Sequence, residues 1–260
     1  MLRCRLSSAP VVAGLLVASC ALASAGEPRA VIELFTSQGC SSCPPADKLL
    51  GELANDPSLI ALSVPIDYWD YLGWKDTLAS PGHSARQRAY ARMRGDREVY
   101  TPQIVVNGLT HVLGSDHTAV ERAIALSDRN AAIMSVPVLM SIGGASLSVK
   151  VAAAKQHAAG EVWLCPLARS VPVEIGRGEN RGRTVTYHNV VRRWLKLGDF
   201  AGNDQIWSVP IADIMSGDID AAVVLVQQGS HDKPGIIFGA ASLPVARQTT
   251  ETKAPAIEAR

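Results

Sequence analysis

The sequence predicts an α/β protein: a four-stranded sheet with flanking helices, followed by a β-sandwich-like all-β domain. Two textures of the 260-residue chain support this. Between residues 30 and 131, near-continuous apolar runs alternate with helical periodicity, which is typical of buried strands and the helices that cover them. From 134 to 245, short β-rich segments are separated by Gly, Asn, Asp or Pro without a convincing helix among them, which favours a sandwich.

The elements of residues 30–131 follow in the order strand, helix, strand, helix, strand, strand, helix. Ser80 is a plausible N-cap for the second helix, with Pro81 at its first position. Asn107 and Gly108 form a turn signal that makes the last two strands a hairpin. The segments are "AVIELFT", "PADKLLGELAND", "SLIALSVPID", "SPGHSARQRAYARMRGD", "TPQIVVNG", "LTHVLGSD" and "HTAVERAIALSDRN".

The N-terminus has the pattern of a secretory signal. "MLRCRLSSAPVVAGLLVASCALASAGEP" carries two arginines, a short apolar run and small residues, so we expect residues 1–25 to be removed. Two alternatives are a bacterial lipoprotein signal, which would leave Cys20 acylated, and a buried N-terminal helix. Export places the protein in the periplasm or outside the cell, where disulfides persist. The polar tail 246–260 is expected to be disordered.

The charge balance narrows the range of partners. Lys plus Arg is 25 and Asp plus Glu is 24, so no strong field attracts nucleic acid or anionic lipid. We therefore expect no nucleic-acid partner, and contact with a membrane only through a lipid on Cys20.

Cys40 and Cys43, in "FTSQGCSSCPPAD", are the residues that point most clearly to chemistry. A structural zinc site needs four ligands, and no second pair with suitable spacing is present. A structural disulfide over two intervening residues removes little loop entropy. Thiol–disulfide exchange fits better: after a strand and at the start of a helix, we expect an exposed Cys40 to attack as thiolate and Cys43 to resolve. No cofactor is needed beyond this disulfide.

One neighbouring feature qualifies this interpretation. Pro44 and Pro45 suggest that the regular helix begins only near Pro45, which weakens the effect of the helix dipole on Cys40. The third cysteine of the mature chain, Cys165, lies in a predicted strand and is expected to be a buried, inert thiol.

Pro102, which opens the strand in "VYTPQIVVNG", is the second anchor. A proline there is often a cis residue of a tight turn, or alternatively a trans residue of an edge strand. The strand–CxxC–helix followed by Thr-Pro at a strand start resembles the thioredoxin superfamily. The resemblance implies that Pro102 is the cis-proline beside the cysteine pair and that Thr101 offers its backbone to a substrate strand.

Longer motifs narrow the resemblance. "ELFTSQGCSSCPPAD", "DYWDYLGWKD", "RQRAYA", "YTPQIVVNG" and "GRGENRGRTVTYHNVVRRW" together resemble the bacterial secreted family called domain of unknown function 1223. The similarity extends over roughly residues 30 to 241. It implies a thioredoxin-like fold and brings no established reaction.

An aromatic loop, residues 67–79, follows the second strand. Tyr68, Trp69 and Trp74 are candidate substrate contacts, because ligands bind at the carboxyl ends of strands in open α/β sheets. Asp67 is a candidate proton acceptor for the resolving step, with Asp70 as an alternative. The rings could instead cover the sheet edge while the acids cap turns.

An arginine-rich segment, residues 177–193, is the last candidate. Guanidinium clusters grip carboxylates and phosphates, which suggests an anion or partner site. The alternative is a solvated hairpin that docks onto the aromatic loop. Its arginines are Arg177, Arg181, Arg183, Arg192 and Arg193.

The sequence therefore favours a periplasmic thiol–disulfide oxidoreductase. Its partners would be protein or small thiol and disulfide substrates, together with a redox partner protein. One alternative is a Cu(I)-handling protein that uses the reduced pair, with His83 or Met93 as further ligands. Another is a binding module whose disulfide does not turn over.

Overall fold

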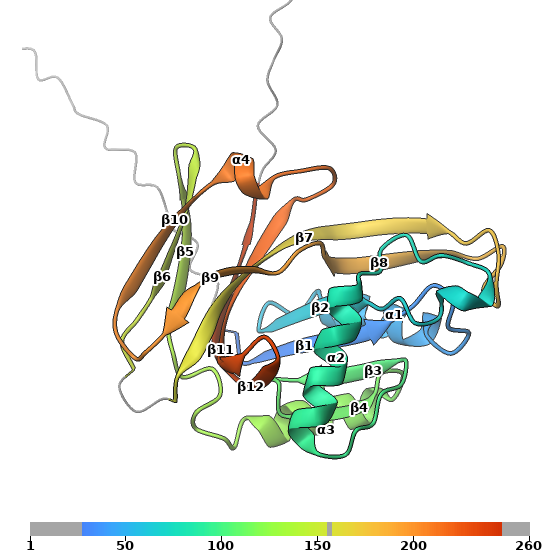
Figure 1. Cartoon of the computed structure of the whole chain (residues 1–260), viewed down its shortest axis with the longest axis horizontal. Coiled ribbons are helices and arrows are strands. Elements are labelled where there is room, and N and C mark those ends of the chain that lie inside the picture. The colour runs from blue at the N-terminus through green and yellow to red at the C-terminus, as the bar shows by residue number, and fades with distance from the viewer. Residues whose placement is uncertain (1–27, 155–157, 246–260) are drawn as a thin grey trace, which may run out of the picture.

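The structure is a computed structural model that describes residues 28–154 and 158–245 (Figure 1). The predicted signal peptide, Cys20 and the tail 246–260 lie outside the described residues. Among the helices described, none is long and apolar enough to cross a membrane.

The first half of the chain forms the predicted elements in the predicted order. Strands β1 and β2 are parallel, β3 is antiparallel to β1, and β4 pairs with β3, so these four strands lie in the order β2-β1-β3-β4. The elements are β1 (Ala30–Thr36), α1 (Pro44–Leu53), β2 (Leu59–Pro65), the 3-10 turn η1 (Asp70–Leu72), α2 (Pro81–Arg94), β3 (Gln103–Val106), β4 (Thr110–Leu113) and α3 (His117–Ser127).

The second half is almost entirely strand. Strands β7, β8, β9, β11 and β12 extend the first sheet to nine strands, while β10, β6 and β5 form a separate three-stranded sheet. The elements are β5 (Val138–Gly143), β6 (Ser146–Val151), β7 (Gly160–Glu174), β8 (Thr184–Val191), β9 (Leu195–Phe200), β10 (Gln205–Pro210), α4 (Ile211–Ile214), β11 (Ala221–Ser230) and β12 (Lys233–Pro244).

The sequence predicted a sheet of four strands, and this is wrong: the sheet continues beyond β2. Strand β8 joins β2 through the single residue pair Ser63–Val190, and β7, β11 and β12 follow beyond it. Apolar patterning alone could not show this, because one pair of neighbouring residues leaves no periodic signal in either strand.

Helix α2 is the reason why the two halves share a core. Tyr90 packs in one cluster with residues of β1 and β2 and with Trp163, Val223 and Ile237 of the second half. Arg86, also on α2, is 1% exposed and donates to Glu33 of β1 at 2.6 Å and to Gln227 of β11 at 2.9 Å. Glu33 supplies the counter-charge that a buried guanidinium needs, and the hydrogen bond to Gln227 joins α2 to the second half of the chain.

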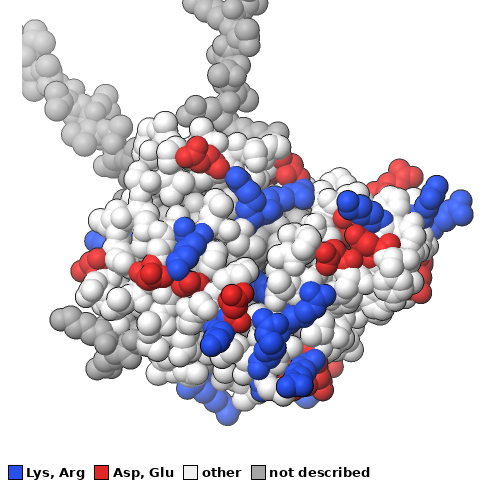
Figure 2. All heavy atoms as spheres, in the orientation of Figure 1, with Lys and Arg blue, Asp and Glu red and all other residues white. Residues whose placement is uncertain are grey.

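Two further cores complete the packing. Helices α1 and α3 cover the other face of β1–β4, where Leu34, Leu50 and Ile124 are among the buried residues. The three-stranded sheet packs its inner face, including Val149, against Val224 and other residues of the large sheet. Lys, Arg, Asp and Glu are interspersed on the face seen in Figure 2, with both signs present over most of it.

Local chemistry accounts for the helix and turn boundaries. The Ser80 hydroxyl accepts a hydrogen bond from Gly82 N–H at 3.2 Å, which confirms the predicted cap. Asn107 and Gly108 both have positive φ, 50° and 67°, as a tight hairpin turn requires. Helix α1 begins at Pro44, one residue before the predicted start, with Cys43 as its N-cap.

Candidate functional site

The cysteine pair lies between the end of β1 and the start of α1. Cys40 and Cys43 form a disulfide, with 5.4 Å between their Cα atoms. The Cys43 carbonyl accepts hydrogen bonds from Ala46 and Asp47, the first bonds of α1. Because Cys43 is the N-cap residue, the pair lies at the positive end of the helix dipole, where a thiolate is stabilised.

The expectation of an exposed Cys40 is wrong. Cys40 is 3% exposed and Cys43 is 0% exposed, so the disulfide lies almost wholly beneath other residues. The prediction that the pair lies between the end of a strand and the start of a helix is confirmed. Its cover comes from loops that no local pattern links to it.

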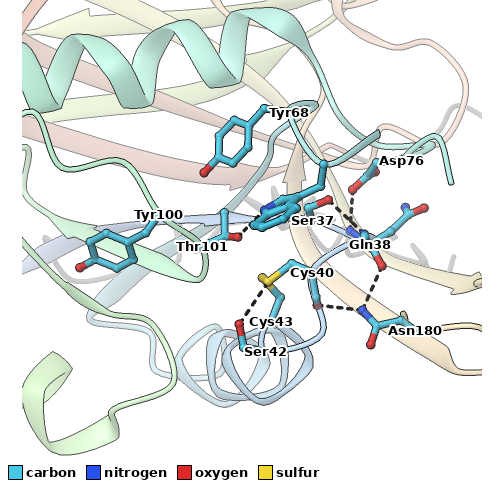
Figure 3. Close-up of a disulfide and its surroundings, with 12 residues drawn as sticks. Ser37, Gln38, Cys40, Ser42, Cys43, Tyr68, Asp76, Tyr100, Thr101 and Asn180 are labelled. Carbon is cyan, nitrogen blue, oxygen red and sulfur yellow. Dashed lines mark hydrogen bonds between the residues drawn. A yellow bond between two sulfur atoms is a disulfide. The ribbon is translucent and has the colours of Figure 1, made fainter. Parts of the chain in front are cut away.

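Ser42 supplies a polar neighbour for the sulfur. Its hydroxyl lies 3.4 Å from Cys40 Sγ, within the range of a hydrogen bond to sulfur (Figure 3). A hydroxyl that donates to a thiolate stabilises the charged form, so Ser42 would favour ionisation of Cys40 once the disulfide is reduced.

The proline loop lies at the same end of the sheet. The Thr101–Pro102 peptide bond is cis, as the resemblance implied. Trp69 of the aromatic loop donates its indole N–H to the Thr101 hydroxyl at 2.7 Å. The Cβ atom of Trp69 is also close enough to Gly39 that a methyl group there would lie 3.1 Å from it. Trp69 therefore connects the proline loop to the residue before Cys40.

The other two predicted ring contacts are also anchored within the molecule. The Tyr68 hydroxyl donates to Gln87 of α2 at 3.1 Å, and Trp74 donates its indole N–H to Gln38 at 2.8 Å. Tyr71, which stacks on Trp69, is 77% exposed. The loop therefore offers one exposed ring, while the polar atoms of the three predicted contacts bind neighbouring elements.

Two residues outside the predicted set of site residues, Asp76 and Asn180, hold the Cys40 loop. Asp76 accepts a hydrogen bond from Gln38 N–H at 2.7 Å. Asn180 donates its side-chain amide to the carbonyl oxygens of Gln38 and Cys40, at 3.0 and 2.8 Å. In Figure 3, Asp76, Gln38 and Asn180 lie on one side of Cys40, and Thr101, Tyr68 and Tyr100 lie on the other. Only the place of Asp76 within the aromatic loop could have hinted at this role.

The turn between β7 and β8 docks onto the aromatic loop, as one of the two interpretations of the arginine-rich segment expected. A Cβ atom at Gly176 would lie 3.1 Å from the Trp74 ring, so these two segments are in contact. Arg177, Arg181 and Arg183 are exposed on this turn. Arg192 instead pairs with Asp218, and Arg193 donates to the carbonyl oxygens of Asp213 and Ile214. The five arginines therefore do not form one site.

Asp47 is the buried acid closest in sequence to the disulfide. It lies four residues after Cys43, which places both side chains on one face of α1 with Cβ atoms about 6 Å apart. Neither carboxyl oxygen has a hydrogen-bond partner among the described residues. Burial raises the pKa of Asp47 to about 8; the Thr36 hydroxyl opposes this rise, and the charge of Asp76 adds to it.

Asp67, the proton acceptor predicted from the sequence, points elsewhere. Its carboxylate accepts a hydrogen bond from the Ser84 hydroxyl of α2. Asp70 accepts from the Asp76 backbone N–H at 3.0 Å. In the described part of the chain, no hydrogen bond joins Asp67 or Asp70 to the Cys40 loop. Asp47, in contrast, lies on α1, the helix that directly follows this loop.

The remaining cysteine and the proposed metal ligands lie apart from the disulfide. Cys165 is a free, fully buried thiol, as predicted, and burial raises its pKa, which disfavours the reactive thiolate. The His83 ring is buried with Nδ1 2.8 Å from the Pro65 carbonyl oxygen, and Met93 is 51% exposed. Within residues 28–154 and 158–245, no group of three or more His, Cys, Asp or Glu could hold a metal ion.

Comparison with known proteins identifies a family. No curated protein matches the chain. The X-ray crystal structure of protein AGR_C_4864 from Agrobacterium tumefaciens is similar at 30% sequence identity and a TM-score of 0.76, covering 86% of this chain and 97% of that one. The family model described as "Protein of unknown function (DUF1223)" matches residues 31–227, and the chain therefore belongs to the DUF1223 family.

Proposed function

We propose that this protein is a thiol–disulfide oxidoreductase in which a thioredoxin-like unit of residues 30–131 carries the reactive pair. The observation that carries the proposal is the meeting of three features at one end of the sheet. A CxxC disulfide caps α1, a cis-proline loop lies beside it, and a buried acid follows one helical turn later.

The exchange would begin with the reduced pair. The Cys40 thiolate attacks a substrate disulfide, forms a mixed disulfide and releases one substrate thiolate. Cys43 then loses its proton, attacks the Cys40 sulfur and releases the second substrate thiol. The substrate disulfide gains two electrons and the dithiol loses two. A redox partner protein in the periplasm would restore the pair.

Asp47 is the proposed acceptor for the Cys43 proton, in place of Asp67. A carboxyl group with a pKa of about 8 is, in its ionised form, nearly as basic as a thiolate, so the carboxylate can take the Cys43 proton and later pass it to solvent. Its position one turn after Cys43 puts it on the side of the resolving sulfur.

Burial of the pair requires that its cover moves before a protein substrate can react. The hydrogen bond between Trp69 and Thr101 joins the aromatic loop to the proline loop, and Tyr71 lies exposed above Trp69. Release of this contact would uncover Cys40 and free Thr101 to pair with a substrate strand.

One observation favours a second candidate, a binding module with an inert disulfide. The disulfide is nearly sealed from solvent. In that case partner capture would survive replacement of Cys40, and the pair would not exchange with thiols.

Trapping separates the two candidates. Cys43→Ser should accumulate a mixed disulfide between Cys40 and a model peptide disulfide, while Cys40→Ser should form none. Cys165→Ser serves as the matched control, because that thiol is buried away from the pair and should leave trapping unchanged. Failure of Cys43→Ser to trap any disulfide, with the fold intact, would contradict the proposed exchange.

A further inference from the structure

A groove between α1 and β8 begins beside the disulfide. Its volume is about 640 Å³, and Pro44, which directly follows Cys43, forms one end. At the other end α1 approaches β8 so closely that a Cβ atom at Gly51 would lie 2.6 Å from the His188 ring. The lining residues are Pro44, Lys48, Gly51, Glu52, Asn55, Arg183, Thr184, Val185, Thr186 and His188.

The β8 side of this groove is an open strand edge. Ile175 N–H donates to the Arg183 carbonyl at 2.9 Å, so residues 183, 185 and 187 direct their backbone groups toward β7. The backbone groups of Thr184 and Thr186 therefore point away from β7. Pro172 stands opposite Thr186, as expected of a pair that exchanges no hydrogen bonds, because proline has no N–H.

None of the described strands takes up these groups. Strand β8 meets β2 only at Val190, beyond the groove, and both threonines are exposed. An edge with unpaired N–H and C=O groups is the template to which an extended segment adds as a further strand.

Charge indicates which segment fits. Arg183 lines the groove and Arg181 lies two residues before it, and both are exposed. Among the described residues, no carboxylate lies within 4.0 Å of the guanidinium of either arginine, whereas the only lining carboxylate, Glu52, is 3.7 Å from Lys48. The end of the groove nearest the disulfide thus carries unpaired positive charge.

We propose that this groove binds an extended, acidic segment of a partner protein, which pairs with the open edge of β8 at Thr184 and Thr186. The helix stripe from Pro44 to Asn55 is about 16 Å long, enough for about five residues of extended chain. This inference rests on the proposed function, because the bound segment would belong to a protein that exchanges disulfides with the Cys40–Cys43 pair. Binding itself requires no redox chemistry.

A binding assay with defined peptides tests the proposal. The probe is a fluorescent, end-capped hexapeptide of alternating Glu and Val, measured by anisotropy with the oxidised protein at low ionic strength. We expect saturable binding of this peptide and none of a Lys–Val hexapeptide. An N-methylated Glu–Val peptide keeps the charge and loses the strand-pairing N–H groups, so it should bind at least about fivefold more weakly. Equal binding of the methylated peptide would show a simple polyanion site and overturn the proposal.

Two matched pairs of variants locate the contact. Thr186→Pro removes an N–H that faces the groove and no β7 bond, and it should weaken binding about fivefold, whereas Thr186→Val should not. Arg183→Glu should abolish binding, while Lys150→Glu, an equal charge change on the outer face of β6, should not. Absence of binding by the folded wild type, or unchanged binding by Thr186→Pro, overturns the proposal. Either result leaves disulfide trapping by Cys43→Ser unaffected, so the two proposals fail separately.

Discussion

The side-chain amide of Asn180 donates a hydrogen bond of 2.8 Å to the carbonyl oxygen of Cys40, from 140 residues further along the chain. Asn180 is 1% exposed, and the same amide also donates to the Gln38 carbonyl. Both carbonyls lie in the loop between β1 and α1, where the local backbone supplies only the Cys43 N–H, at 3.2 Å from the Cys40 carbonyl oxygen. The second half of the chain thus fixes the backbone of the residue proposed to attack.

Replacing Asn180 should loosen that loop. Asn180→Ala leaves the Gln38 carbonyl without a donor and the Cys40 carbonyl with the Cys43 N–H alone, which costs about 1 to 3 kcal/mol and raises the population of states with Cys40 uncovered. We expect dithiothreitol to reduce the Cys40–Cys43 disulfide several-fold faster in this variant. The rate is measured under native conditions by alkylation of the thiols that reduction releases. Asn130→Ala, which removes a turn contact to Ala132 far along the chain, is the control and should leave the rate unchanged. An unaltered reduction rate in Asn180→Ala would show that Asn180 only supports the fold.

The contact between Trp69 and Thr101 should limit access to the disulfide. Trp69→Phe keeps an aromatic ring and loses the indole N–H, and Thr101→Val keeps the shape and loses the hydroxyl. Each variant should accelerate reduction by a small thiol to the same extent, about threefold to tenfold for a net hydrogen bond near 1 kcal/mol. The double variant should be no faster than either single one, because the two changes remove one interaction. If the accelerations of the two single variants add in the double variant, the hydrogen bond between Trp69 and Thr101 is not what limits access to the disulfide.

The raised pKa of Asp47 makes stability depend on pH in a defined direction. Its folded-state pKa of about 8 lies above the ordinary 3.8, so its neutral form favours the folded state. This contribution is complete below pH 4 and is lost as the pH rises to 8. Asp47→Asn should lack the loss, so between pH 4 and pH 8 it gains stability relative to the wild type, by at most about 5 kcal/mol.

Urea unfolding of the oxidised proteins over this pH range measures the difference. Taking wild type minus variant cancels other titrating groups, such as His83, whose pKa burial lowers to about 4. If the free energies of unfolding of the wild type and Asp47→Asn change in parallel with pH, the buried environment described for Asp47 is contradicted. If Asp47 also accepts the Cys43 proton, Asp47→Asn in the protein that keeps Cys43 should slow resolution of the mixed disulfide formed by Cys40, and more so at pH 7 than at pH 9.

The buried pair of Glu33 and Arg86 should be essential to stability, because it neutralises the guanidinium that links α2 to Gln227 of the second half. Glu33→Gln leaves the Arg86 guanidinium, which is 1% exposed, without its counter-charge and should cost about 3 to 5 kcal/mol. Adding Arg86→Met removes the isolated charge and should recover part of that loss. Thermal unfolding monitored by tryptophan fluorescence provides the comparison. A double variant less stable than Glu33→Gln alone would show that the guanidinium is held by its other contacts, such as the Trp194 ring.

Much of the fold could be predicted because its signals are local. Each of β1 and β2 is covered on both faces and reads as an apolar run, and Ser80 and the Asn107–Gly108 turn mark boundaries through their own side chains or backbone. The cysteine pair and the cis bond before Pro102 were recognisable for the same reason, since each depends on adjacent residues.

What could not be predicted depends on contacts between distant segments. Asn180 is one amide in a turn, and nothing in its surroundings in the sequence points to Cys40. The cover over the disulfide comes from the same kind of contact, so an exposed Cys40 was the natural and incorrect expectation. Asp47 did leave a signal: an acid four residues after Cys43 lies on the same helix face as the pair, whereas attention to the aromatic loop favoured Asp67.

The reduction potential of the Cys40–Cys43 couple tests the central claim most directly. Equilibration of the native protein with glutathione buffers, followed by alkylation of free thiols, gives the oxidised fraction at each potential. An exchanging pair should titrate reversibly as a two-electron couple between about −270 and −120 mV, the range of known thiol–disulfide oxidoreductases. A potential below about −300 mV, typical of structural disulfides, or no reduction of the folded protein, would contradict the account.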